Sequence, residues 1–386
     1  MTPFDAATHT DPYAYYAALR RQNGLSFDTD LRLWIASSAD AVDAILGHPD
    51  CRVRPLNELI PPAIAQGASG TVFGRLMRMN EGPQHQCPRL VIEPALASVE
   101  TDSLTGIVAR VLKTLDNPIE NLDELMFTLP IGVIASLMGI PSSRLQAVAR
   151  LTRDFVACLS PLSDAAQHNK ADCAATGLNP LFSALLSDDR QASPFLSQIH
   201  AGCAATAWGE TDALIANLIG LLSQTCEATA GLIGNTLVAL QRDPDLIATL
   251  QSAPLLVTDL VAEVARYDSP VQNTRRFVAK RCWVGDCVLE AGDTVLLLLA
   301  SANRDPSANP APDRFLLKRT QRKTFSFGSG RHECPGQRLA LTIAAEAILA
   351  WLFQPPPCTP RFERWSYLPS VNGRIPQFHR PQESQQ

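Results

Sequence analysis

Residues 325–340 read Phe-Ser-Phe-Gly-Ser-Gly-Arg-His-Glu-Cys-Pro-Gly-Gln-Arg-Leu-Ala, and no other segment of the chain is as informative. Gly328, Gly330 and Gly336 surround a single cysteine, Cys334, just before a helix predicted to begin near Gln337. Glycine tolerates positive φ and close backbone packing, so amide N–H groups can point at the cysteine sulfur. A helix N-terminus also stabilises a thiolate. The segment therefore predicts an activated cysteine beside a flat ligand.

This segment resembles the haem-binding loop of the cytochrome P450 family, which runs Phe-x-x-Gly-x-His/Arg-x-Cys-x-Gly. Its fixed positions are matched by Phe327, Gly330, His332, Cys334 and Gly336. The resemblance implies that Cys334 is the axial thiolate of haem b (iron protoporphyrin IX) and that Phe327 packs beside the sulfur. It also implies the family's fold, which is mainly α with a small β-sheet region and forms a triangular helical prism around a buried haem.

Two further motifs support the resemblance. Residues 263–266, Glu-Val-Ala-Arg, place an acid and a base on one face of a predicted helix, a pair that by itself contributes only about 0.2–0.5 kcal/mol. Residues 312–315, Pro-Asp-Arg-Phe, resemble the family's Pro-x-Arg-Phe loop. The resemblance implies that Glu263, Arg266 and Arg314 form a buried charged network with a structural role.

Haem carries two propionate carboxylates, and these need hydrogen-bond donors. His85 and Arg89 lie on an early predicted helix, Arg276 follows residues 269–271, and His332 belongs to the cysteine segment. Arginine pairs with both oxygens of a carboxylate, and histidine donates from its ring. Because each of the four matches a family contact, the resemblance implies that they bind the propionates.

One long helix is predicted over residues 211–242, where Asp243-Pro244 disfavours continuation. Its apolar side chains lie on more than one face, so it should pass through the interior. Other helices are predicted at residues 104–115, 122–138, 144–159 and 255–267, and short strands around residues 276–278, 282–288 and 294–299.

The middle of the long helix departs from the family pattern. The family's oxygen-activating stretch has a small residue, Gly, any residue, an acid and then Thr. Here Gln224 and Thr225 occupy the two small positions, Glu227 is the acid, and Ala228 replaces the alcohol. In the family the alcohol and the acid organise water that delivers protons, and alanine cannot do so. Thr229 is rotated by about 100° from that position, whereas Thr225 lies closer to it.

Three interpretations follow from this anomaly. A substrate hydroxyl or an ordered water completes the proton relay, which we favour. Alternatively, Thr225 or Gln224 takes part, or the enzyme catalyses an oxidation that depends less on proton delivery. Gln224 is equally a candidate partner for a polar substrate group and an ordinary helix contact.

The composition excludes several function classes. The chain has 386 residues, of which 46% are hydrophobic and 18% charged, as in an ordered globular protein. Its net charge of −5 argues against a surface devoted to nucleic acid. We find no leader pattern, no apolar run long enough to span a membrane, and no CxxC pair among the ten cysteines. We expect a cytoplasmic protein with neither nucleic-acid nor membrane partners and with mostly reduced core cysteines.

The resemblance covers nearly the whole chain, and no linker divides it. We therefore expect a single domain over residues 1–386, without a fused reductase, that acts as a monomer. Electrons would come from a separate ferredoxin with its reductase. The docking face expected for an acidic ferredoxin is a basic cluster around the cysteine segment: Lys318, Arg319, Arg322, Lys323, Arg331 and Arg338.

The sequence therefore predicts a haem-thiolate monooxygenase that oxidises an organic substrate with O2, within secondary (specialised) metabolism. By family position, the pocket walls are residues 59–72, 151–186, 218–222, 272–274 and 371–372. They mix apolar and polar groups, which suits a mid-sized molecule with a few polar handles. Ala228 motivates one alternative, an atypical oxidation such as desaturation, coupling, dealkylation or peroxide-driven turnover. The other alternative is a non-catalytic haem protein that binds a ligand as a sensor.

Overall fold

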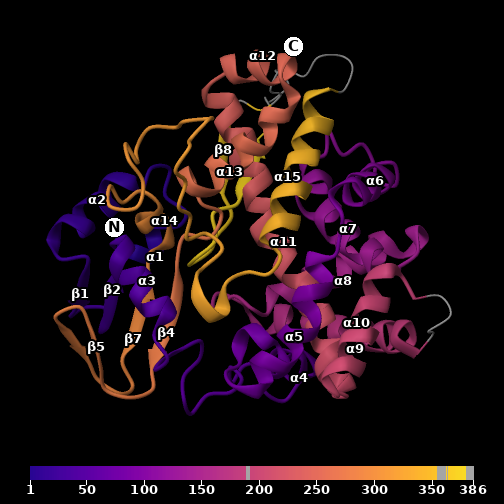
Figure 1. The fold of residues 1–386 in the computed structure, drawn as a ribbon, viewed down its shortest axis with the longest axis horizontal. Coiled ribbons are helices and arrows are strands. Elements are labelled where there is room, and N and C mark those ends of the chain that lie inside the picture. Colours follow the sequence, from indigo (N-terminus) through magenta and orange to yellow (C-terminus); the bar gives the residue numbers. More distant parts are fainter. Residues whose placement is uncertain (188–191, 354–361, 363, 380–386) are drawn as a thin grey trace.

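The computed structural model describes residues 1–187, 192–353, 362 and 364–379. A five-stranded sheet lies at one side of the molecule, and most helices lie at the other (Figure 1). The strand order is β1-β2-β7-β4-β3, with β2 and β7 parallel and the other neighbours antiparallel. The strands are β1 (Leu25–Asp28), β2 (Leu33–Ala36), β3 (Cys51–Arg52), β4 (Thr274–Val278) and β7 (Thr294–Leu297). Two hairpins pair β5 (Cys282–Val284) with β6 (Cys287–Leu289) and β8 (Arg364–Tyr367) with β9 (Pro376–His379).

Helices dominate the described residues, as the sequence predicts. The α-helices are α1 (Pro3–Ala6), α2 (Tyr13–Gln22), α3 (Ala39–Gly47), α4 (Ala68–Arg75), α5 (Pro83–Ala97), α6 (Thr101–Leu112), α7 (Leu129–Leu137), α8 (Leu145–Ala157), α9 (Ala165–Ser187), α10 (Pro194–Thr206), α11 (Thr211–Arg242), α12 (Asp245–Ser252), α13 (Val257–Tyr267), α14 (Leu299–Asn303) and α15 (Gln337–Leu352). Shorter helical turns are η1 (Met77–Met79), η2 (Glu124–Thr128), η3 (Ser142–Arg144), η5 (Pro254–Leu256) and η6 (Gly330–His332).

The long helix α11 has the predicted bounds and runs through the middle of the helical part (Figure 1). Most of its side chains are buried, including Leu218, Leu222 and Leu237, which are fully so. Gly231 lets the C-terminal segment approach closely, because a Cβ there would lie 2.9 Å from the carbonyl oxygen of Arg374. Helix α11 is therefore the element against which the rest of the core packs.

The predicted helix over residues 122–138 contains a π-helical turn. Residues 122–123 are helical, the turn η2 covers Glu124–Thr128, and α7 follows it without a break. Pro130 stands in the first turn of α7, and proline cannot donate the backbone hydrogen bond that would continue a regular helix. The amide of Leu129 instead donates to the carbonyl of Glu124, which widens the turn.

Arg374 ties the two ends of the described chain together. Its Nε donates to the Asp268 carboxylate at 2.6 Å, and its Nη atoms donate to the carbonyls of His9, at 2.6 Å, and Thr10, at 3.1 Å. Tyr13 on α2 donates its hydroxyl to the same carboxylate at 2.6 Å. Through Arg374, residues near the N-terminus are fixed beside the segment that packs on α11. No helix among the described residues has the length and apolarity needed to cross a membrane.

Candidate active site

An irregular segment of residues 304–324, called the strap, follows helix α14. The cysteine segment forms a tight loop between the end of this strap and helix α15. Gly328 and Gly330 have φ values of 72° and 68°, a region that side chains other than glycine rarely adopt. The amide of Cys334 donates to the carbonyl of Phe327 at 2.8 Å, and α15 begins at Gln337 as predicted. These contacts fix the cysteine at the turn that leads into the helix.

The Cys334 sulfur accepts a hydrogen bond from the backbone amide of Gly336, as the sequence indicated. The side chain is solvent-exposed, yet the surrounding protein desolvates the thiol and so raises its pKa. The Gly336 amide and the charge of Arg89 act in the opposite direction. The side chain is accessible to solvent but is surrounded by protein, and both are expected of a group that faces an internal space. The sulfur is therefore free to ligate a group held inside the protein.

Ser326 and Asn303 hold the start of this loop. The Ser326 hydroxyl contacts the Ser269 hydroxyl at 2.7 Å and the carbonyl of Ala265. Asn303, at the end of α14, donates to Ser326 Oγ at 2.9 Å and accepts from the Phe325 amide at 2.6 Å. Sequence reasoning missed the structural role of these two residues. They couple the loop to α13 and α14.

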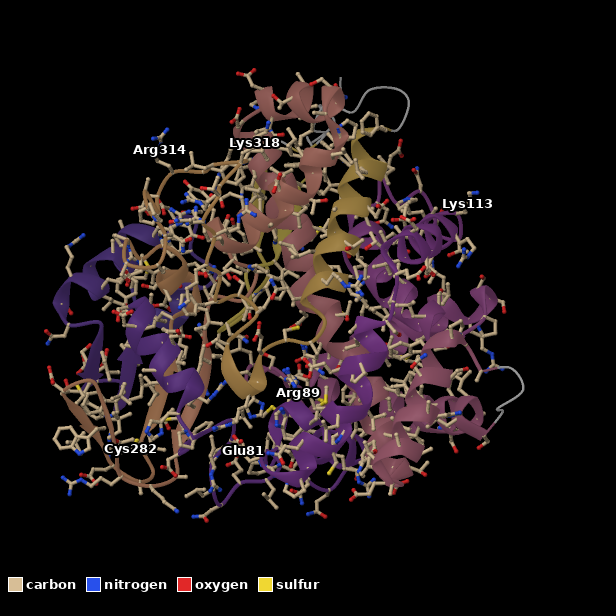
Figure 2. The ribbon with its side chains drawn as sticks, viewed as in Figure 1. Glu81, Arg89, Lys113, Cys282, Arg314 and Lys318 are labelled. Carbon is tan, nitrogen blue, oxygen red and sulfur yellow. The ribbon has the colours of Figure 1, made fainter. Side chains whose placement is uncertain are left out.

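His85 and His332 come together, as the propionate assignment requires. Their ring centroids are 4.1 Å apart, and His332 Nε2 lies 3.3 Å from a carboxylate oxygen of Glu81. Burial lowers the pKa of His85 to about 4, and the charges of His332 and Arg89 act in the same direction. The His85 ring is therefore neutral at neutral pH, with one N–H to donate. Figure 2 shows Arg89 and Glu81 in the lower middle of the view.

Arg276 and Arg89 differ in how their side chains are used. Arg276 is 6% exposed, and its Nε has no hydrogen-bond partner among the described residues. Burial lowers its pKa to about 10, while the charge of Glu81 raises it. Arg89 donates instead to the carbonyls of Arg331, at 3.0 Å, and Glu333, at 2.8 Å, so in this structure it braces the cysteine loop.

These groups fit a haem. Cys334 offers a sulfur that faces an internal space, and Arg276 offers a buried N–H without an acceptor. An unmade hydrogen bond of a buried charged donor is costly, and a propionate oxygen would satisfy it. His85 and His332 lie side by side as further donors.

The middle of α11 carries its polar residues as the sequence indicated, but two of them are already engaged. Gln224 donates from Nε2 to the carbonyl of Gly220 at 2.9 Å, and Thr225 donates from its hydroxyl to the carbonyl of Leu221 at 2.8 Å. Glu227 is solvent-exposed although it lies halfway along a mostly buried helix. Burial nevertheless raises the pKa of its carboxyl, and the charge of Arg78 opposes this rise. Like Cys334, Glu227 thus faces an internal space, and the neighbouring Ala228 offers no polar atom.

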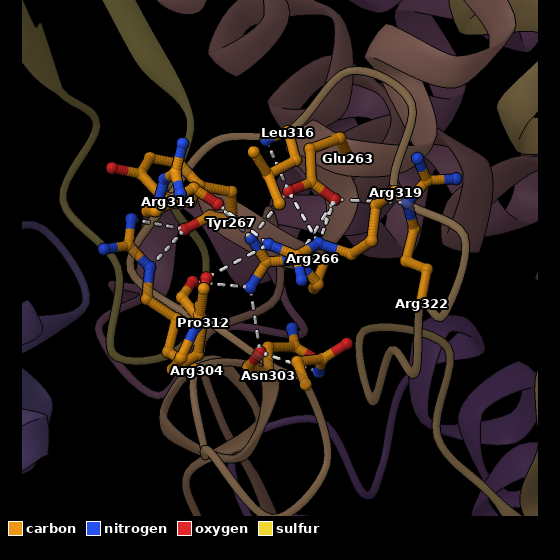
Figure 3. A network of polar contacts seen from close by, with 12 residues as sticks. Glu263, Arg266, Tyr267, Asn303, Arg304, Pro312, Arg314, Leu316, Arg319 and Arg322 are labelled. Atoms are coloured by element: carbon orange, nitrogen blue, oxygen red, sulfur yellow. Dashed lines mark hydrogen bonds and ion pairs between the residues drawn. The ribbon is translucent and has the colours of Figure 1, made fainter.

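The charged network forms around Glu263, with one correction to the expected membership (Figure 3). Glu263 and Arg266 are fully buried, and Arg266 donates to both carboxylate oxygens at 2.7 and 3.1 Å. Arg319 and Arg322 each donate from Nε at 3.1 Å. Burial raises the pKa of Glu263, but the hydrogen bonds and charge of Arg266, with the other donors, hold it below its ordinary value.

The prediction that the side chain of Arg314 is the third member of this network is wrong. Its side chain is exposed, and only its carbonyl takes part, accepting from Arg266 at 3.2 Å and from Arg319 at 2.9 Å. Once the carbonyl points inward to satisfy those donors, the side chain of the same residue turns outward. Arg319 occupies the position that had been assigned to Arg314.

The basic cluster expected around the cysteine segment is divided between buried and exposed side chains. Arg319 and Arg322 are engaged by Glu263, Lys323 pairs with Asp43 at 2.9 Å, and Arg331 pairs with Glu81 at 3.1 Å. Arg338 donates to backbone carbonyls at the end of α5. Lys318 is exposed, and Figure 2 shows it in the upper part of the view, away from Glu81 and Arg89. Arg319 and Arg322 therefore serve an internal contact, whereas Lys318, Lys323 and Arg338 are exposed.

A second group of ligand-type atoms belongs to the core. His48, Cys51 and Cys282 bring theirs within 4.8 Å of one another, and the two thiols share a hydrogen bond. Burial raises the pKa of Cys51 to about 12, so this thiol is neutral. Both cysteines pack in an apolar cluster, and all cysteines within the described residues are free. This pair behaves as small apolar side chains, the role expected for most cysteines.

Comparison with known proteins supplies the family. A family model described as Cytochrome P450 matches residues 216–355. Cytochrome P450 107B1 of Saccharopolyspora erythraea is 30% identical over 368 residues, which cover 90% of this chain and 88% of the relative. Cytochrome P450 monooxygenase PikC of Streptomyces venezuelae is 28% identical, and the match covers 89% of this chain and 83% of the relative.

Among solved structures, P450BioI in complex with an acyl carrier protein ligated to hexadec-9Z-enoic acid has the same fold. Its TM-score is 0.81 and its sequence identity is 24%, and the match covers 95% of this chain and 97% of that chain. At the identity and coverage of cytochrome P450 107B1, the chain belongs to the cytochrome P450 family of monooxygenases.

Proposed function

We propose that this protein uses haem b, O2 and electrons from a separate ferredoxin and its reductase to oxidise a mid-sized organic substrate in specialised metabolism. The observation that carries the proposal is the Cys334 loop, whose sulfur accepts the Gly336 amide and faces an internal space. Relatives such as PikC, a named monooxygenase, support the reaction type. We also propose that residues 1–386 act as one cytoplasmic, monomeric domain.

Cys334 would ligate the haem iron, and His85, His332 and Arg276 would hold its propionates. When bound, thiolate-ligated haem supplies the activation of O2, because the sulfur donates electron density that favours O–O cleavage. Arg89 contributes indirectly, since its hydrogen bonds to the Arg331 and Glu333 carbonyls keep the loop in position. The buried Glu263 network fixes the strap that precedes the loop.

Glu227 is the proton donor of the site. Burial raises the pKa of its carboxyl, which makes the group a better proton carrier than an ordinary glutamate, and the side chain faces the space where a proton would be delivered. Ala228 has no hydroxyl to receive this proton. The Thr225 hydroxyl can accept a hydrogen bond, but its own proton is committed to Leu221. These contacts favour a relay completed by an ordered water or by a polar group of the substrate.

Two optical measurements test the proposal on the purified haem-loaded protein. The reduced carbon monoxide adduct should show the thiolate signature in the wild type and lose it in Cys334→Ser. Titration of the ferric protein with a metabolite library should give a saturable spin-state shift with one compound class, and product analysis with surrogate ferredoxin and reductase should then find an oxygenated product. A sample that lacks the thiolate signature, or that binds ligands without consuming electrons, would overturn the proposal.

Ala228 favours one alternative reaction for the same site. Without the usual alcohol, the enzyme would catalyse a desaturation, a coupling, a dealkylation or a peroxide-driven oxidation, which depend less on proton delivery. Product analysis separates the alternatives, because insertion of an oxygen atom from labelled O2 requires monooxygenation. Turnover by peroxide alone, or a product without labelled oxygen, would favour the alternative.

A further inference from the structure

Arg78 is a partly buried arginine whose side chain makes no hydrogen bond and no ion pair with any residue that the structure describes. Its Nε is fully enclosed. The guanidinium has five N–H donors and does not lose its charge in proteins. Because an uncompensated buried charge is costly, a side chain of this kind indicates an acceptor that arrives from outside the chain.

The backbone around Arg78 is clamped to helix α11. The amide of Met77 donates to Asn217 Oδ1 at 2.7 Å, and Asn217 donates back to the carbonyl of Arg75 at 3.0 Å. Leu76 packs so closely that a Cβ at Gly220 would lie 2.7 Å from its Cδ2 atom. The turn η1 is therefore held rigidly on the face of α11 that leads to the polar middle of the helix.

Among the described residues, Glu227 is the charged group whose electrostatic interaction changes the pKa of Arg78. Burial lowers the pKa of Arg78 and raises that of Glu227, and each partly offsets the other's shift. The two side chains do not form an ion pair within contact distance. Arg78 thus lies on the Glu227 side of the active site, with its charge incompletely balanced.

The haem propionates are not the expected partner of Arg78. Among the propionate candidates, His85 interacts with His332 and Arg89, and Glu81 acts on both His85 and Arg276. None of these groups acts on Arg78, whose resolved electrostatic neighbour is on α11. The propionate donors and Arg78 therefore belong to different parts of the site.

We propose that Arg78 binds the carboxylate of the substrate, so that the enzyme oxidises an organic acid. This inference rests on the proposed monooxygenase function and names its substrate class. A guanidinium pairs with both oxygens of a carboxylate through two N–H groups, which fixes orientation as well as charge. A carboxylate held there would also bring a hydrogen-bonding oxygen to the side of the site where Ala228 has none.

The test uses haem-loaded protein and a probe that reports binding without turnover. The probes are ω-(imidazol-1-yl)alkanoic acids of increasing chain length and their methyl esters, because the imidazole ligates the iron and gives an optical shift. In the wild type, at least one acid should bind about tenfold or more tightly than its ester. In Arg78→Leu, and in Arg78→Gln as a milder neutral variant, the acid and the ester should bind within about twofold of each other.

The matched control is Arg75→Gln. Arg75 lies three residues earlier on α4, but it is exposed and paired with Asp212 at 3.2 Å. This variant should keep the preference for the acid, and Arg78→Lys should keep part of it because the charge remains.

Two results would overturn the inference while leaving the proposed function intact. In the first, acids and esters bind equally to the wild type at every chain length, although the carbon monoxide adduct has its thiolate signature. In the second, both neutral Arg78 variants transfer haem to apomyoglobin faster but keep the preference for acids, which would make Arg78 a propionate ligand. A missing thiolate signature would instead overturn the proposed function, and this inference with it.

Discussion

The carboxylate of Glu263 accepts a hydrogen bond from Nε of Arg319 at 3.1 Å, across a separation of 56 residues. Arg319 also donates to the carbonyls of Pro310 and Arg314, so one guanidinium connects helix α13 to the strap that precedes the cysteine loop. Arg314 contributes a carbonyl only. The loop that carries Cys334 is therefore anchored through a buried charge cluster that makes no direct contact with the cysteine.

Substitution of Arg319 should destabilise the protein, whereas substitution of Arg314 should not. Arg319→Gln removes buried charge-assisted hydrogen bonds to Glu263 and should lower the free energy of unfolding by about 1.5–3 kcal/mol. Arg314→Gln alters an exposed side chain and should stay within about 0.5 kcal/mol. Denaturant unfolding followed by circular dichroism compares them, and equal effects would contradict the assignment.

The Asp268 carboxylate should contribute stability that is lost in acid. Burial raises its pKa, but the charge of Arg374 and the hydrogen bond from Tyr13 hold the pKa below the ordinary value of 3.8. As the pH falls below 3.8, the unfolded chain takes up a proton before the native protein does, so stability declines until the native pKa is reached. In Asp268→Asn, stability should be lower at neutral pH, and its decline between about pH 5 and 2 should be shallower. Parallel pH profiles for the two proteins would refute this account.

Removal of the Arg276 side chain should weaken haem retention. Its unpaired Nε is available to a propionate, and a charge-assisted hydrogen bond contributes about 1.5–3 kcal/mol, which corresponds to a factor of about 10 to 100. Haem transfer to apomyoglobin from Arg276→Leu should accelerate within that range. Arg275→Leu is the control, because Arg275 precedes it on β4 but is exposed. If both variants release haem at the wild-type rate, Arg276 is not a propionate ligand.

Restoring an alcohol beside Glu227 should change how efficiently electrons are used. Ala228→Thr supplies a hydroxyl that can receive the Glu227 proton, so less of the electron supply should end as peroxide when a substrate lacks polar groups. The measurement is product formed per reductant consumed, with peroxide quantified in parallel. A variant that releases more peroxide and forms less product would show that the site works with water or substrate alone.

Gln224 should prove to be a helix contact and not a substrate ligand. Its Nε2 is already bonded to the Gly220 carbonyl, so Gln224→Ala should leave substrate affinity and product distribution unchanged within about twofold. The spin-state titration and product analysis measure both quantities. A large loss of affinity confined to substrates with a polar group would assign Gln224 to substrate binding.

Local sequence was sufficient to predict the cysteine loop and the bounds of α11. Gly328 and Gly330 are required by their positive φ values, and Asp243-Pro244 ends the helix, so these features depend on near neighbours alone. The π-helical turn within residues 122–138 was less visible, because the effect of Pro130 depends on how the preceding turn packs.

Side-chain direction in the irregular strap could not be predicted in the same way. Arg314, Arg319 and Arg322 follow no helical or strand period, and which of them points inward depends on carbonyls that need donors. Arg78 carried a weak signal, a single cation between two methionines in a mainly apolar stretch. Its relation to Glu227 exists only after η1 has packed on α11.

The contact of Arg374 with the carbonyls of residues 7–10 has a consequence for protein synthesis. The partners are separated by up to 367 residues, so these carbonyls have no donor from Arg374 until almost all of the chain has been translated. At about 5–20 residues per second, that interval lasts roughly 20–70 s. The partners of Tyr13 and Tyr16 on α2, Asp268 and Gln272, are translated earlier, so the segment before α2 waits longest for its native contacts. The yield of folded protein should therefore depend on translation speed and chaperone supply more than on the stability of the finished molecule.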